Sequence, residues 1–238
     1  MVYKYNIYEK IVMAIINSLS NFAIFPTIFL IYYQKNIFTY YVSYFSMVVS
    51  VMYHICESLD VKIFLEQLKW HELDNIGAIY SFSQMTLPLT IFNNDINYKT
   101  KKNYIFFFFL LFIQQRGPWE IINTILPLVI DFSFALISII IHGIPYYNKS
   151  ILKKACFFMC ISLFLFYQGL DDLNDYLRLW HAIWHVFIGI TSFYFLQIQE
   201  EKYISFKEIF LIHFGYYKNK KGINSKEKEV NIFFIIFP

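Results

Sequence analysis

The chain has 238 residues, of which 58% are hydrophobic and only 16% are charged, and its formal net charge is +3. A soluble domain of this size has about 25% charged residues. The composition therefore excludes an ordinary soluble enzyme. Long apolar runs recur along all but roughly the last forty residues, which predicts an integral membrane protein.

We expect an all-α integral membrane protein, with a bundle of seven transmembrane helices in residues 1–198 and a basic cytosolic tail in residues 199–238. No cleavage pattern follows the first apolar run, so this run is predicted to act as its own targeting signal. The fourth span is the shortest and is expected to begin nearer Ile96 or to thin the bilayer locally. The predicted spans are Ile11–Tyr33, Ile37–Cys56, Leu73–Phe92, Asn103–Gln115, Trp119–His142, Ile151–Gly169 and Leu179–Gln197.

The distribution of Lys and Arg predicts the orientation of these spans. With seven spans, most basic residues lie on the side of the C-terminal tail, and basic residues favour the cytosol. We therefore expect a lumenal or extracellular N-terminus and a cytosolic C-terminus, in the secretory pathway or the plasma membrane. The Lys-rich tail either contacts anionic lipid or is solvated, and nothing further in the sequence indicates nucleic-acid binding.

Three segments bring polar side chains to one side of the membrane. Ser50 and His54 lie four residues apart near the end of the second span, so they share one helix face. Asp74 opens the third span, and His181 and His185 lie four residues apart at the start of the seventh. These three positions share a side in either orientation. We therefore expect the three histidines to converge.

The converging imidazoles predict a metal site. Three neutral imidazoles with an open fourth position match catalytic zinc. The absence of cysteine among the ligands favours Zn²⁺, although iron, nickel and copper remain alternatives. Asp74 is then the expected general base, and Ser50 the hydrogen-bond donor to water or to an oxyanion. The competing interpretation is that each histidine is a hydrogen-bonded residue at the membrane interface.

The other polar residues receive structural interpretations. Asp131 is expected to be a protonated or hydrogen-bonded acid facing the bundle interior, and His71 to be solvated. His142 is expected at the opposite membrane face, and His213 has no assigned role. The acidic loop before the last span is expected to be solvated, and the cysteines to be free or packed. These residues are Asp171, Asp172 and Asp175 in the loop, and Cys56, Cys156 and Cys160.

Three short motifs resemble a known family. They are Tyr53-His54-Ile55-Cys56-Glu57, Arg116-Gly117-Pro118-Trp119 and His181-Ala182-Ile183-Trp184-His185. The set resembles myomaker and the post-GPI-attachment phospholipase-like transmembrane proteins, within the superfamily of alkaline ceramidases, progestin and adiponectin receptors and GPI-remodelling proteins. The resemblance covers about residues 10–198. It implies a seven-helix fold, zinc on the three histidines, and hydrolysis of an amide or ester bond in a lipid.

Two functions therefore stay open. The first is a zinc-dependent lipid hydrolase, whose partners are the bilayer and a membrane lipid such as a GPI or a phospholipid acyl chain. The second is a non-enzymatic receptor or membrane fusion or remodelling factor with a structural zinc. Transport fits less well, because the sequence shows no internal repeat and no paired broken helices.

Overall fold

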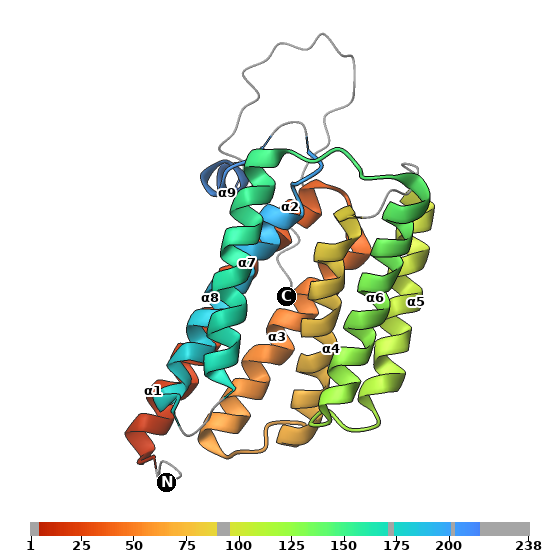
Figure 1. Ribbon diagram of the computed structural model, residues 1–238. Coiled ribbons are helices and arrows are strands. Elements are labelled where there is room, and N and C mark those ends of the chain that lie inside the picture. The colour runs from red at the N-terminus through yellow and green to blue at the C-terminus, as the bar shows by residue number, and fades with distance from the viewer. Residues whose placement is uncertain (1–4, 90–95, 171–173, 201–202, 215–238) are drawn as a thin grey trace.

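The computed structural model describes residues 5–89, 96–170, 174–200 and 203–214, which fold into long, roughly parallel helices and contain no strand (Figure 1). The predicted all-α class is confirmed. The helices are α1 (Ile7–Ser20), α2 (Phe25–Tyr33), α3 (Ile37–Leu59), α4 (Gln67–Thr86), α5 (Ile96–Gln114), α6 (Ile121–His142), α7 (Lys149–Gly169), α8 (Leu179–Phe195) and α9 (Phe206–His213).

Four helical segments are long and apolar enough to cross a membrane: Ile7–Tyr33, Ile37–Leu59, Ile121–His142 and Lys149–Gly169. In the first of these, a 3₁₀ turn joins α1 to α2. These segments are consistent with a multi-pass membrane protein. The other long helices satisfy this criterion less well, because the first turns of α4 and α5 are rich in charged residues and α8 has only 17 residues.

The helices at the third and fourth predicted spans depart most from the predicted bounds, and neither is among the four candidate spans. Helix α5, at the fourth predicted span, begins at Ile96, which agrees with the expectation of an earlier start. Its 19 residues have a length of about 28 Å at 1.5 Å per residue. The third begins earlier than predicted, at Gln67, because the Trp70-His71-Glu72 segment continues the helix outward. Its α-helix ends at Thr86, and the predicted end at Phe92 lies outside the described residues.

Small residues let the helices of the site approach closely. A Cβ atom on Gly77 in α4 would lie 2.6 Å from Cβ of Ser46 in α3. A Cβ atom on Gly189 in α8 would lie 2.8 Å from the carbonyl oxygen of Ala23. Such contacts are typical of helix packing in membranes, where small side chains allow backbones to meet. They hold α3, α4, α8 and the turn after α1 around one central space.

Asp131 faces the interior of the bundle, as predicted. Its Oδ1 lies 3.0 Å from Nζ of Lys102, and its carboxylate accepts a hydrogen bond from the Thr86 hydroxyl. Lys102 belongs to α5 and its side chain is only 14% exposed.

The described part of the tail packs on the bundle. Ile209 of α9 is buried, and the His213 ring stacks on Phe29 of α2 with ring centroids 3.8 Å apart. Residues 215–238 lie outside the described residues, so the basic tail stays a prediction.

Candidate metal centre

The end of α3 and the starts of α4 and α8 lie at one end of the bundle, opposite α9 (Figure 1). Local sequence fixes where these helices stop and start. Asp60 ends α3 in a left-handed conformation, with φ of 54°. Leu177 and Arg178 also have left-handed backbones, which turn the chain into α8 so that its first two turns carry His181 and His185.

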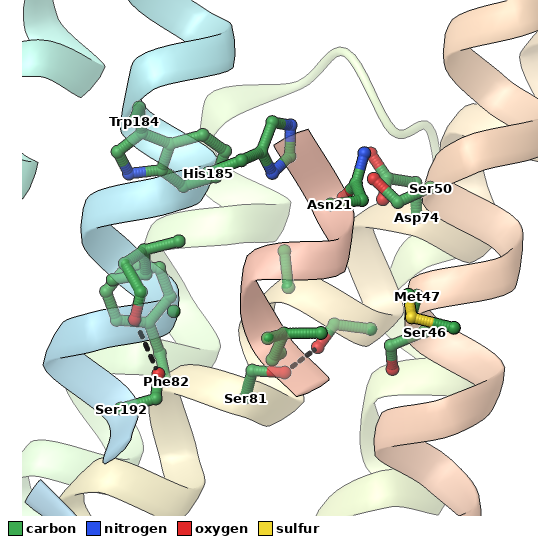
Figure 2. Close-up of a pocket in the computed structure, with 15 residues that line it drawn as sticks. Asn21, Ser46, Met47, Ser50, Asp74, Ser81, Phe82, Trp184, His185 and Ser192 are labelled. Carbon is green, nitrogen blue, oxygen red and sulfur yellow. Dashed lines mark hydrogen bonds between the residues drawn. The ribbon is translucent and has the colours of Figure 1, made fainter. Parts of the chain in front are cut away.

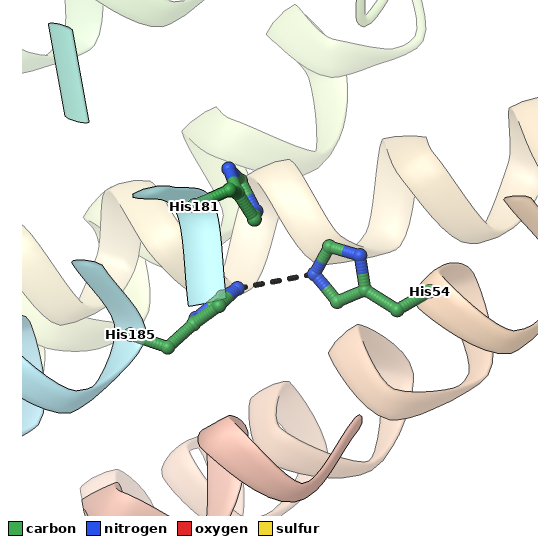
Figure 3. A group of neighbouring side chains, drawn as sticks. All are labelled: His54, His181 and His185. Atoms are coloured by element: carbon green, nitrogen blue, oxygen red, sulfur yellow. Dashed lines mark hydrogen bonds between the residues drawn. The ribbon is translucent and has the colours of Figure 1, made fainter. Parts of the chain in front are cut away.

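The three predicted histidines converge (Figure 3). Nε2 of His54 lies 3.1 Å from Nε2 of His185, and ligand atoms from all three rings lie within 4.8 Å of one another. His54 is buried, whereas His181 and His185 are partly buried. Helix α3 supplies the first ring and α8 supplies the other two.

The donor set fits a metal ion. Zinc binds imidazole nitrogen at about 2.0–2.1 Å, so two ligands of a tetrahedral ion lie about 3.3 Å apart. The separation of 3.1 Å between Nε2 of His54 and Nε2 of His185 is close to this value, and the ligand atoms of all three rings lie within 4.8 Å of one another. The group could therefore hold a metal ion, as the sequence predicted. Three imidazoles suit zinc, iron, nickel or copper, so the donors alone do not select among them.

Glu57 is a residue of this site that the sequence analysis did not assign. Its Oε2 lies 3.4 Å from Nδ1 of His54, one turn away on α3. Its Oε1 accepts a hydrogen bond from Tyr53 at 2.7 Å and lies 3.5 Å from Nη2 of Arg178. A carboxylate on the far nitrogen of a histidine ligand fixes the tautomer and orients the ring. The spacing of His54 and Glu57 by three residues was the available signal.

Asp175 holds the start of α8. Its carboxylate accepts hydrogen bonds from the backbone N–H groups of Trp180 at 2.8 Å and His181 at 3.1 Å. Burial raises the pKa of this carboxyl, and the two N–H groups act in the opposite direction. The expectation that this loop is solvated was wrong for Asp175, which is 0% exposed, because it caps the helix. Asp171 and Asp172 lie outside the described residues.

Helix α7 reaches the site through Gly169. A Cβ atom there would lie 3.0 Å from the backbone nitrogen of His181 and 3.1 Å from its Cα. Glycine therefore lets the end of α7 rest against the His181 backbone. The sequence analysis did not identify this contact.

Ser50 and Asp74 lie together in the cavity that His185 also lines (Figure 2). They face each other from α3 and α4 across from His185, and all three line a cavity of about 70 Å³. The predicted acid and hydroxyl are thus brought to the same cavity as one of the predicted ligands.

The remaining histidines stay outside the cluster. His71 stacks on Trp119 at 3.9 Å and lies 4.8 Å from the Tyr53 ring. Its expected solvation was wrong, because these rings cover it and its Nδ1 is buried. His142 is exposed at the far end of α6, as predicted. Cys56 is buried, Cys156 and Cys160 are exposed, and all three are free, as predicted.

These features define a helical protein, consistent with membrane insertion, that carries a three-histidine group able to hold a metal ion. Residues 9–186 match the protein family of unknown function DUF3522, and the chain belongs to this family. No curated protein matches the chain.

Proposed function

We propose that this chain is a seven-helix membrane protein that binds zinc through His54, His181 and His185 and hydrolyses an amide or ester bond of a membrane lipid. In this proposal α4, α5 and α8 also cross the bilayer, the N-terminus is lumenal or extracellular, and the tail is cytosolic. The observation that carries it is the shared cavity of Asp74, Ser50 and His185, because hydrolysis needs a base and a hydrogen-bond donor beside the metal.

Bound zinc would polarise the carbonyl and lower the pKa of a coordinated water to about 7. In this proposal Asp74 would act as the general base that takes a proton from water, and the support for this role is that Asp74 and His185 line the same cavity. Ser50 lies next to Asp74, which supports a role in which its hydroxyl would donate a hydrogen bond to the developing oxyanion. The lipid is expected to enter laterally from the bilayer. The motif resemblance to GPI-directed phospholipase-like proteins supports a lipid substrate.

The test is release of fatty acid by the zinc-loaded protein in liposomes that contain a fluorescent-acyl phospholipid or ceramide. We expect Asp74→Asn to lower turnover by about 10²–10⁴-fold and Ser50→Ala by about 10²–10³-fold, with zinc retained. Ser162→Ala is the matched control. Ser162 is buried like Ser50, but it belongs to α7 and does not line the cavity, so this variant should keep full activity. Equal activity in all four proteins would contradict these roles.

A second candidate is a non-enzymatic receptor or fusion or remodelling factor in which zinc clamps helices together. The observation that favours it is the direct bridge between α3 and α8, in which Glu57 joins His54 to Arg178. The cavity beside the histidines is also small, at about 70 Å³. No lipid turnover by zinc-loaded wild type, together with a large loss of thermal stability on zinc removal, would favour this candidate.

A further inference from the structure

The turn before α8 contains two consecutive residues with left-handed backbones. Leu177 has φ of 57° and ψ of 17°, and Arg178 has φ of 56° and ψ of 37°. Neither is glycine, and a residue with a Cβ atom adopts this conformation only at a steric cost. Such a turn persists only where its surroundings hold it in place. The turn leads directly into the first turn of α8, which carries His181.

Side chains at the start of the chain hold this turn. The N–H group of Leu177 donates a hydrogen bond to the Tyr5 hydroxyl at 3.3 Å, and its carbonyl oxygen accepts one from Nδ2 of Asn17 at 3.3 Å. Next to them, the Tyr176 hydroxyl donates to the Glu9 carboxylate at 2.7 Å. Both backbone polar groups of Leu177 are therefore bonded to side chains from the N-terminal segment. We call Tyr5, Glu9 and Asn17 the N-terminal clamp.

The local structure of α1 fixes two members of the clamp. Glu9 closes a capping box with Asn6, so the start of the helix sets the position of the carboxylate that Tyr176 meets. Asn17 lies further along α1 and is only 1% exposed. Its Nδ2 also donates to the carbonyl of Met13 at 2.9 Å, so both hydrogens of the amide are used. A polar side chain is costly inside a membrane span, and these two bonds offset the cost.

The turn is connected to the metal-ligand group through Asp175. The backbone N–H of Arg178 donates to the Asp175 carbonyl oxygen at 3.0 Å, and the Asp175 carboxylate accepts a hydrogen bond from the N–H of His181 at 3.1 Å. Leu177 lies inside this hydrogen-bonded unit. A change in its backbone conformation therefore moves the backbone of His181.

We propose that Tyr5 and Asn17 are positioning residues for the metal ligand His181. They hold Leu177 in its left-handed conformation, and the turn then places His181 in the three-histidine group. The N-terminal segment thereby sets the affinity of this group for a metal ion, although it supplies none of the ligands. This inference rests on the metal binding in the proposed function and is independent of lipid hydrolysis.

The test uses cobalt(II) as the probe, because it binds the same imidazole sites as zinc and its visible absorption spectrum changes with coordination geometry. The full-length protein in detergent is titrated with cobalt, and its melting temperature is measured without metal. We expect Asn17→Leu to weaken cobalt binding by about 10-fold and to change the spectrum, because a ligand is misplaced. Tyr5→Phe, which removes a single hydroxyl, should act in the same direction.

Two controls separate positioning from general damage to the fold. Tyr8→Phe removes a hydroxyl from a neighbouring side chain that is 78% exposed, and it should leave cobalt binding unchanged. Asn103 is buried like Asn17, but its amide bonds Gln84 and Thr39, away from the turn. Asn103→Leu should therefore lower the melting temperature without changing the cobalt affinity or the spectrum.

Glycine at the turn provides the decisive comparison. Because glycine adopts the left-handed conformation without steric cost, Leu177→Gly should restore most of the cobalt affinity and melting temperature lost in Asn17→Leu. A loss that Leu177→Gly does not restore would overturn the inference, and so would unchanged cobalt affinity in both Asn17→Leu and Tyr5→Phe. A wild type that binds no cobalt would contradict the metal site and this inference together. Cobalt binding without lipid turnover would contradict the hydrolysis alone.

Discussion

Oε2 of Glu57 lies 3.4 Å from Nδ1 of His54, one helical turn along α3. The opposite nitrogen of the same ring, Nε2, faces His185 at 3.1 Å. The carboxylate therefore selects the tautomer in which Nε2 has a free lone pair for a metal ion. Tyr53 and Arg178 hold the carboxylate in turn, so the ring is oriented by groups from both α3 and the start of α8.

Replacing this carboxylate tests its effect on the metal. Glu57→Gln keeps the size of the side chain but removes the charge that favours Nδ1–H on His54. We expect zinc affinity, measured by competition with a chromogenic chelator, to fall by about 10–100-fold. Glu66→Gln is the control, because Glu66 is 71% exposed and pairs with Lys62 at the surface. An affinity that Glu57→Gln does not change would show that Glu57 does not orient His54.

The contact between α7 and α8 gives a second prediction. In Gly169→Ala the new methyl group would lie 3.0 Å from the His181 nitrogen, so the His181 backbone must shift by a few tenths of an ångström. We expect weaker zinc binding and a lower melting temperature in detergent, because the shift misplaces a ligand. Reduced stability with unchanged zinc affinity would contradict the proposed link between this glycine and the ligand.

The buried pair of Lys102 and Asp131 gives a third prediction. Removing one partner leaves an uncompensated buried charge, so Lys102→Met should lower the free energy of unfolding by about 3–5 kcal/mol. Adding Asp131→Asn to this variant should restore much of the loss, which a double-mutant cycle in detergent measures.

Lys101→Met is the matched control for this pair, because the neighbouring Lys101 side chain is exposed. It should change stability little. Equal effects of the Lys101 and Lys102 substitutions would show that the ion pair at 3.0 Å contributes nothing specific.

The helical class and the pairing of His181 with His185 were predictable because they depend on short-range patterns. Long apolar runs predict helices, and His181 and His185 share a helix face through their spacing of four residues. His54 was grouped with them by topology. The end of the second predicted span and the start of the seventh lie on the same side of the membrane, so side chains there can meet.

The surroundings of the site were not predictable, because they depend on packing between helices. Glu57, Asp175 and Lys102 carry charges and would ordinarily be exposed, and only the fold shows that each has a buried partner. The contact of Gly169 with His181 joins α7 to α8 without any sequence motif. The start of α4 at Gln67 likewise lies in a charged segment that hydropathy does not assign to a span.

The most direct test is the metal content of the detergent-purified protein, measured by inductively coupled plasma mass spectrometry. We predict about one zinc per chain in the wild type and in His71→Ala, whose side chain lies near the cluster but outside it. We predict none in a folded variant with His54, His181 and His185 all changed to Ala. A folded wild type without zinc, or a triple variant that retains it, would contradict the zinc site on which the proposed function rests.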